Sequence, residues 1–221
     1  MSEFENGTLS PWGYTIDSER LPNFINKQDF NLFTNYKFGD DTRIDKNIPS
    51  ATAAIRDYCG WHISPSLECG VMFNVRDLRD AFVGCDLLVQ LPATFVSKVS
   101  KVLLNATFDS SAGDYSGDEV TDFDLDPSGL LRVYDVSGLN RKSKIFIHYT
   151  AGYPDDAIEV IKELTAHRVV HAVSSSYGVM SEAAGGVSVT YNASWAGNTR
   201  STALADDNRE VLDKFKAKGV F

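Results

Sequence analysis

The most regular pattern of hydrophobic positions lies between residues 144 and 172. Residues 144–150 are rich in β-branched and aromatic side chains, which predicts a strand with at least one buried face. Gly152 ends this strand, and Pro154 suits the first position of a helix because its missing N–H costs nothing there. We therefore expect a helix from about Pro154 to Ala172, with acids at its start. Its apolar side carries Ala157, Ile158, Ile161, Leu164, Thr165, Arg168, Val169 and Ala172.

Between residues 70 and 149 the pattern changes to alternation interrupted by turns. Five strands are predicted, at residues 71–75, 87–91, 96–104, 130–136 and 144–150. The sequence Asp-Pro-Ser-Gly at residues 126–129 favours a type I turn before the fourth of these strands. Because the strands follow one another at short spacing, we expect a small antiparallel sheet or a sandwich.

Two further helices are predicted. One runs from Ser50 to about Tyr58 and is stopped by Gly60. The other can be capped by Asp206 or Asp207. Its apolar residues are Val211, Leu212 and Phe215.

Two segments lack a sustained period. Residues 174–186, rich in Ser and Gly, have the composition of a flexible connection, and alternation over 187–191 predicts a short strand after it. Residues 1–46 carry isolated aromatic side chains among Asn, Asp and Gly. They are expected to form an extended arm whose aromatics dock onto another surface, although packing on the chain's own core remains an open alternative.

The chain therefore divides into three parts. Residues 1–46 form the extended N-terminal arm, and residues 47–173 form an α+β domain with a β insertion at about 70–150. Residues 174–221 hold a flexible segment, a short strand and a C-terminal helix. At 221 residues, such a chain can bury a sizeable core.

Charge and cysteine content limit the classes of function. The net charge is −9, from 21 Lys plus Arg and 30 Asp plus Glu, which disfavours specific binding of nucleic acid. An acidic surface is compatible with a channel through which DNA passes without being bound, because it repels the duplex. No apolar run approaches the ~18 residues of a membrane helix, and the first residues are acidic, so we expect synthesis in the cytoplasm and no membrane contact. Cys59, Cys69 and Cys85, an odd number without CxxC spacing, predict buried reduced thiols.

His167 and His171 lie four residues apart on the predicted central helix, a spacing that could bind a transition metal. Arg168 stands where an HExxH motif has Glu, and no third ligand is evident, so a boundary or subunit-interface role is favoured. Cys59 and His62 could form a thiol–imidazole pair, but no residue that would orient them is evident.

The alternating acids at residues 122–126 imitate the start of a calcium loop. Pro127 and Val133 stand where that loop needs Gly and Glu, so a strand with Phe123 and Leu125 facing inward is favoured. The GxSxG, GxGxxG and P-loop motifs do not occur. We expect no catalytic, cofactor or metal site, and no enzyme.

Four segments, taken in order, resemble one protein family. They are an Ala-rich helix with an aromatic near its end (49–61), a Leu-Pro strand followed by Val-x-x-Val (87–104), a strand ending in Tyr-x-Ala-Gly-Tyr-Pro before an acidic helix start (144–172), and a Ser/Gly-rich segment (181–191). Their order resembles that of the head-to-tail connector, or adaptor, proteins of long-tailed bacteriophages. The resemblance covers about residues 48–218.

This resemblance implies an α+β fold with a small helical connector core, made of the first helix, the long central helix and the C-terminal helix. An antiparallel β subdomain is inserted between the first two, and the termini are extended. It implies a structural protein of the virion neck, forming a ring of about twelve copies. The expected partners are the portal protein on one side, a stopper or tail-terminator protein on the other, and double-stranded DNA passing non-specifically.

Two other functions remain as alternatives. One is a non-catalytic, β-type ligand-binding module of a phage tail, which would expose aromatic side chains on a sheet face. The other is a small hydrolase that uses His148, His167 or His171.

The candidate partner-interface residues are hydrophobic side chains near the two ends, which a free monomer would expose to water. In the connector family the C-terminal part reaches toward the portal. The candidates are Leu212, Phe215, Val220, Phe221, Phe4, Trp12 and Tyr14.

Overall fold

The computed structural model describes residues 8–17, 19, 21–78, 81–111, 114–174, 181–184, 187–190 and 206–218. It contains helices and antiparallel sheets, which confirms the α+β class. The chain divides into two compact units. The β unit comprises Met1–Pro22, Cys59–Ala157 and Phe215–Phe221, and the helical unit comprises Asn23–Tyr58 and Ile158–Lys214.

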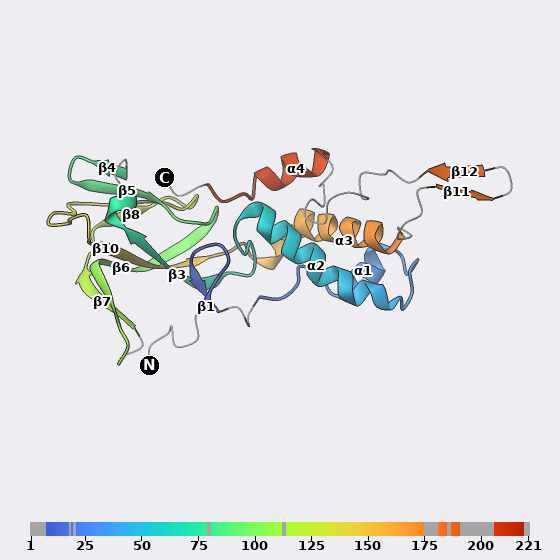
Figure 1. The fold of residues 1–221 in the computed structure, drawn as a ribbon, viewed down its shortest axis with the longest axis horizontal. Helices are drawn as coiled ribbons and strands as arrows, with labels where there is room; N and C mark the ends of the chain where they lie inside the picture. Colours follow the sequence, from blue (N-terminus) through green and yellow to red (C-terminus); the bar gives the residue numbers. More distant parts are fainter. Residues whose placement is uncertain are drawn as a thin grey trace. The chain divides into compact units, whose positions relative to one another are not determined.

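The larger sheet of the β unit has six strands in the order β1-β2-β3-β10-β6-β7, all antiparallel to their neighbours (Figure 1). Their bounds are β1 (Thr8–Leu9), β2 (Thr15–Ile16), β3 (Leu67–Asn74), β10 (Lys144–Ala151), β6 (Val96–Asp109) and β7 (Asp114–Glu119). The central strand β10 is buried on both faces from Ile145 to Tyr149. This explains why its sequence is a nearly continuous apolar and aromatic run.

The second sheet of the β unit has the order β4-β5-β9-β8. Its strands are β4 (Phe82–Val83), β5 (Asp86–Gln90), β9 (Leu130–Val133) and β8 (Phe123–Leu125). The turn predicted at residues 126–129 joins β8 to β9. There the Gly129 N–H donates to the Asp126 carbonyl at 2.8 Å, and the Ser128 N–H donates to the Asp126 carboxylate at 2.8 Å. All five predicted strands are present; β1, β2, β4 and β7 were not predicted.

The helical unit contains α1 (Lys27–Phe33), α2 (Thr42–Cys59), α3 (Glu159–Ser174) and α4 (Asp206–Asp213). A short 3-10 turn, η4 (Asp155–Ile158), leads into α3. The core of this unit forms because apolar residues recur every three or four positions along α2 and α3. It consists of Ile25, Phe30, Ile44, Ile48, Ala51, Ala166, Val169 and Val173.

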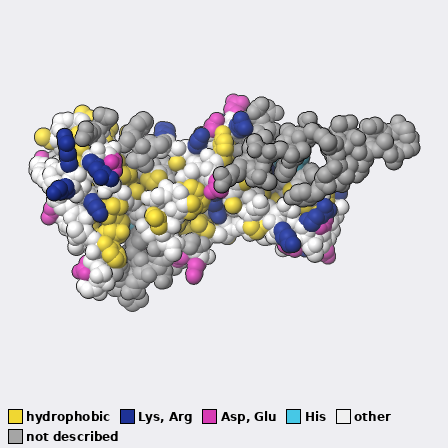
Figure 2. All heavy atoms as spheres, viewed as in Figure 1, with side chains coloured by type: hydrophobic (Ala, Val, Ile, Leu, Met, Phe, Trp, Pro, Cys, Tyr) yellow, Lys and Arg dark blue, Asp and Glu magenta, His cyan; other side chains and the backbone are white. Residues whose placement is uncertain are grey.

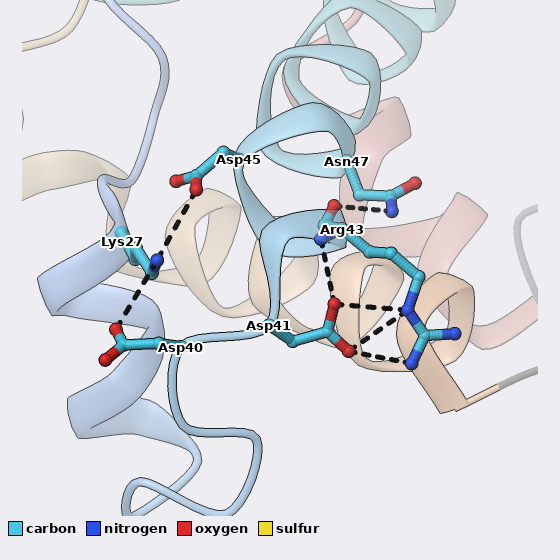
Figure 3. Close-up of polar contacts among 6 residues, drawn as sticks. All are labelled: Lys27, Asp40, Asp41, Arg43, Asp45 and Asn47. Atoms are coloured by element: carbon cyan, nitrogen blue, oxygen red, sulfur yellow. Dashed lines mark hydrogen bonds and ion pairs between the residues drawn. The ribbon is translucent and has the colours of Figure 1, made fainter.

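Polar contacts fix the start of α2 and connect it to α1 (Figure 3). Asp41 caps the helix by accepting a hydrogen bond from the Arg43 N–H at 2.8 Å. The Arg43 guanidinium also binds this carboxylate at 2.7 Å, and the hydrogen bond lowers the pKa of Asp41. On α1, Lys27 lies 3.5 Å from the Asp40 carboxylate and 3.4 Å from that of Asp45.

The described part of residues 1–46 is folded on the chain's own core, which supports the second of the two alternatives left open. Tyr14, Phe30 and Ile44 are almost completely buried. The helix predicted from Ser50 to about Tyr58 is α2, and it begins at Thr42 rather than at Ser50. Pro49 lies inside it, and because proline usually interrupts a helix, the sequence pattern placed the start too late.

Other boundaries also differ from those predicted. Pro154 precedes the first helical turn instead of occupying it. Residues 181–184 form β11 (Ser181–Ala184), which pairs with β12 (Val187–Thr190), so part of the expected flexible connection is a hairpin. Residues 175–180, 185–186 and Tyr191 lie outside the described part. Of the three cysteines, Cys85 is exposed, contrary to the expectation that all are buried. In the part of the chain described, no helix is apolar and long enough to cross a bilayer.

Candidate functional site

A pocket of about 490 Å³ lies in the β unit where β3, β4 and the connection from β9 to β10 meet. Its size is in the range of small-ligand and side-chain sites. Buried or half-buried apolar side chains line one part of it, and the exposed side chains of two arginines line another. The lining residues are Val75, Arg76, Phe82, Val136, Gly138, Leu139, Asn140 and Arg141.

Backbone hydrogen bonds hold the walls of this pocket together. The Val75 N–H, just after β3, donates to the Ser143 carbonyl at 3.0 Å. The Val136 N–H donates to the Cys85 carbonyl at 2.8 Å, which ties the β9–β10 connection to the β4–β5 turn. The pocket is therefore formed by segments from three parts of the sequence that are fixed to one another.

The arginine side of the pocket is a tight turn at residues 140–143. The Asn140 side-chain carbonyl accepts from the Lys142 N–H at 2.8 Å, and the Asn140 backbone carbonyl accepts from the Ser143 N–H at 2.9 Å. The Ser143 hydroxyl donates to the Asn105 side-chain oxygen on β6 at 2.6 Å. These hydrogen bonds fix the backbone of the turn, and the side chains of Arg141 and Lys142 on it are exposed.

Four cations lie on or next to this pocket. Arg141, Lys142 and Lys144 come from the turn and the start of β10, and Arg76 comes from the segment after β3. Arg76 lies 3.3 Å from Asp77, and both side chains are well exposed. Among the described residues, no ion pair links Arg141, Lys142 or Lys144 to an acid. In a chain of net charge −9, this is a local reversal of sign, suited to anionic groups.

Figure 2 shows Lys and Arg side chains gathered beside hydrophobic ones over the strands of the β unit. The four cations on or next to the pocket, Arg76, Arg141, Lys142 and Lys144, are called the basic cluster, and they were not predicted as a site. The signal was present as three cations in the four residues 141–144. Arg76 could not be added from sequence, because only the pairing of β3 with β10 brings it close.

Of the N-terminal interface candidates, Tyr14 lies inside the fold and Trp12 packs against it. Tyr14 has 1% of its surface exposed, and its hydroxyl lies 2.8 Å from the His62 Nδ1 and accepts from the His62 N–H at 3.0 Å. Trp12 is half-buried and stacks on Tyr14 with ring centroids 6.0 Å apart. The expectation that a single subunit exposes Tyr14 is therefore wrong. Phe4 lies outside the described residues.

The C-terminal candidates are also partly used within the chain. Leu212 on α4 is fully buried, which contradicts its expected exposure in a single subunit. Phe215 is half-buried; its carbonyl accepts from the Trp61 indole N–H at 2.6 Å, and its ring meets that of Tyr153 edge-on at 5.4 Å. Val220 and Phe221 lie outside the described residues. A contact of any of these residues with a partner stays a prediction.

The histidine candidates are not brought together. His167 and His171 are exposed on α3, and His167 lies edge-on to Phe33 at 5.1 Å. His148 is buried in β10, with its Nε2 atom 3.9 Å from the Glu68 carboxylate. Among the described residues, no group of three His, Cys, Asp or Glu side chains could hold a metal ion.

His62 is enclosed by backbone and aromatic groups. Its Nε2 atom lies 3.0 Å from the Ala151 carbonyl and 3.1 Å from the Pro65 carbonyl, while Tyr14 occupies the other ring nitrogen. This arrangement fixes the ring in the core, where no substrate reaches it. Burial also raises the pKa of the Cys69 thiol far above its usual range, which is the property of an inert structural cysteine.

No model of a known protein family matches this chain, and no curated protein matches it either. Any functional conclusion therefore rests on the chain's own residues and contacts.

Proposed function

We propose that this protein is a structural component of a bacteriophage neck, a head-to-tail connector that forms a ring between the portal and the tail. The observation that carries this proposal is the order of the four segments that resemble the family, at residues 49–61, 87–104, 144–172 and 181–191. Connection of capsid to tail requires binding surfaces and a passage, and it requires no catalytic residues.

The arrangement of the two units supports the proposal. Residues 59–157 belong to the β unit and stand in the sequence between α2 and α3 of the helical unit. The helical unit thus combines two separate stretches of chain around one apolar core. This is the architecture expected of a connector core with an inserted β subdomain.

The charge of the chain supports a passage for DNA. A net charge of −9 keeps a duplex from adhering along the wall, because phosphate groups bind where counterions are released from a cationic surface. Ring assembly would place copies of the same surface around the duplex at regular intervals. The partners are then the portal on one side, a stopper or tail-terminator protein on the other, and neighbouring copies of this chain.

The test is a phage genome in which this reading frame is interrupted. We expect DNA-filled heads and free tails to accumulate separately, and we expect the intact protein supplied in trans to restore joined particles. Electron microscopy of negatively stained lysates provides the readout. Normal joined virions in the absence of the protein would disprove the proposal.

The alternative of a ligand-binding tail module has weaker support. A carbohydrate-type site would expose a cluster of aromatic side chains on a sheet face. Phe108 on β6 is exposed, and Tyr115 beside it on β7 is half-buried. Trp61 is fully buried, Trp12 is half-buried against Tyr14, and Trp195 lies outside the described residues. The pocket in the β unit is lined by Arg76 and Arg141 beside apolar side chains, and two guanidinium groups favour an acidic protein segment over a neutral sugar ring.

A further inference from the structure

Two surfaces of the β unit are complementary in charge and in apolar character. One is the pocket with its basic cluster. The other is the acidic hairpin, defined as residues 108–111 and 114–119 at the ends of β6 and β7. This hairpin contains four acids and no Lys or Arg. The acids are Asp109, Asp114, Asp118 and Glu119.

The acidic hairpin presents an aromatic side chain to solvent. Phe108 has 59% of its surface exposed, which is unusual for a large apolar residue. Its immediate neighbour in sequence is Asp109, and its partner across the strands is Tyr115, whose ring lies 5.2 Å away. The hairpin thus combines an exposed apolar group with carboxylates on both strands.

The hairpin is held in place by packing and by a bulge. Tyr115 stacks on Phe146 of β10 with ring centroids 4.0 Å apart. The register of β6 against β7 shifts between Leu104 and Thr107, and a bulge of this kind bends the strands that follow. Gly117 lies opposite, where a Cβ atom would stand 2.5 Å from the Leu104 carbonyl. The two strands that carry Phe108 and Tyr115 are therefore held in place by contacts within the chain.

The pocket offers the matching features. Val75 and Val136 are buried at its apolar part, Phe82 and Leu139 are half-buried there, and the pocket volume of about 490 Å³ accommodates an aromatic ring. Arg76 and Arg141 on its lining can form paired hydrogen bonds with carboxylates that flank such a ring. Apolar side chains make up part of this lining beside the two arginines, so the site can contact an aromatic ring as well as a carboxylate, whereas a phosphate group would use only the arginines.

We propose that the acidic hairpin of one copy docks on the pocket and basic cluster of a second copy, with Phe108 in the pocket and the carboxylates near it against Arg76 and Arg141. The contact joins two different surfaces of the same chain. Such a heterologous interface builds a ring when the rotation between copies closes. The inference rests on the proposed function only for ring closure, since association itself needs no viral partner.

The test is self-association of the full chain, measured by sedimentation velocity over a range of concentrations. Arg141→Glu, Asp109→Arg and Phe108→Ala should each weaken association about tenfold or more, because each removes one complementary group from a buried contact. The double variant Asp109→Arg/Arg141→Glu exchanges the two charges between the surfaces. It should recover most of the wild-type association, which simple loss of folding cannot produce.

Matched controls separate this contact from effects of net charge. Lys98→Glu on β6 and Asp122→Arg before β8 change the charge by the same amounts as the test substitutions, at exposed positions outside both surfaces. Both should associate like wild type. Thermal melts check folding; if Asp109→Arg loosens the hairpin turn, where Asp109 accepts from the Ser111 N–H at 2.9 Å, Phe108→Ala still tests the contact.

Three results would overturn the inference. They are a wild-type chain that stays monomeric at every concentration, association that neither Arg141→Glu nor Phe108→Ala weakens, and a double variant as weak as the single ones. Binding of a labelled DNA duplex that Arg141→Glu abolishes while association is unchanged would instead assign the basic cluster to nucleic acid. The joining assay tests the proposed function separately, since a connector could assemble through another surface.

Discussion

Different kinds of contact stabilise the inside of each of the two units. The helical unit depends on apolar side chains that recur at helical spacing within short stretches, such as Ile44, Ile48 and Ala51 on α2. The β unit depends on pairing between strands far apart in the sequence, as between β3 and β10, and on single positions where one atom decides the fit. The first kind of contact can be recognised in a sequence, whereas the second depends on tertiary approach.

Gly152 is a position in the β unit where a single added atom would disrupt the fit between two backbone segments. It follows β10 with φ of +125°, a backbone conformation that side chains other than hydrogen rarely allow. A Cβ atom there would lie 2.1 Å from the Pro65 carbonyl oxygen, which belongs to another backbone segment and cannot rotate away. In the core of the helical unit, by contrast, a substitution can remove part of a large side chain without forcing two atoms to overlap.

The largest effect should follow from Gly152→Ala. Strain at positive φ and the overlap with the Pro65 carbonyl should together lower the free energy of unfolding by about 3 kcal/mol or more. Urea denaturation provides the measurement. Gly138→Ala is the matched control, because Gly138 also has positive φ, +83°, but its Cβ would meet nothing within 4 Å. Similar losses for both variants would show that backbone conformation, and not the close approach, is decisive.

The next effect should come from the core of the helical unit. Ile161 on α3 is fully buried, so Ile161→Ala should cost about 2 to 5 kcal/mol through lost burial and the cavity left behind. Val160, the preceding residue, has 45% of its surface exposed, and Val160→Ala should change stability by less than about 1 kcal/mol. Thermal melts and hydrogen exchange of the α3 amides measure both. Equal effects would mean that the apolar side of α3 is assigned incorrectly.

The sequence predicted the elements with strong periods and missed those defined by partners. The central helix, its buried Ile161 and Leu164, and the strands β3, β5, β6, β9 and β10 were predicted, because hydrophobic side chains repeat along them. The strands β1, β2 and β4 have only two residues each, too few to show any period. Strand β7 was missed because all its residues except Tyr115 are acidic or small, and it is a strand because β6 pairs with it.

The candidate site was less predictable than the fold. Isolated aromatics near the N-terminus were expected to face a partner, yet Tyr14 finds its partner in His62, 48 residues away. The pocket was not predicted for a similar reason. Its Arg76 and Arg141 are far apart in the sequence and come to one pocket only because β3 pairs with β10. Side-chain type indicates what a residue can do, whereas the register of the sheet decides which residues do it together.

Tyr14→Phe tests the buried polar contact of the β unit with little change in shape. It removes the hydroxyl that accepts from the His62 N–H and should cost about 1 to 3 kcal/mol, because a buried donor is left without this acceptor. Tyr134→Phe is the control. The Tyr134 hydroxyl donates to the exposed Asp124 carboxylate, where water can replace it, so a loss below about 0.5 kcal/mol is expected. Chemical denaturation at neutral pH compares the two.

The smallest effects should come from two half-buried carboxylates, one in each unit. Asp86 on β5 accepts hydrogen bonds from Arg132 on β9 and from the Asp135 N–H, and the Arg132 bond lowers the pKa of Asp86. Asp41 has its pKa lowered in the same way by Arg43, only two residues away. A carboxyl whose pKa is lowered on folding stabilises the protein above its unfolded pKa, near 3.9, and loses that contribution as pH falls through the folded value.

Asp86→Asn and Asp41→Asn should therefore be slightly less stable than wild type at neutral pH, with the difference shrinking below about pH 4 as the wild-type carboxyl becomes protonated. Asn also caps helices well, so Asp41→Asn should lose only the charge, and hydrogen exchange at the start of α2 should change little. Asp86→Asn should speed exchange in β5 and β9, because Arg132 joins those two strands through this carboxylate. Denaturation curves at neutral and acidic pH provide the stabilities. If the stability difference between wild type and each variant stayed the same in acid, the ionised carboxylate would not be the source of the stabilisation. The two units would then not share this electrostatic contribution.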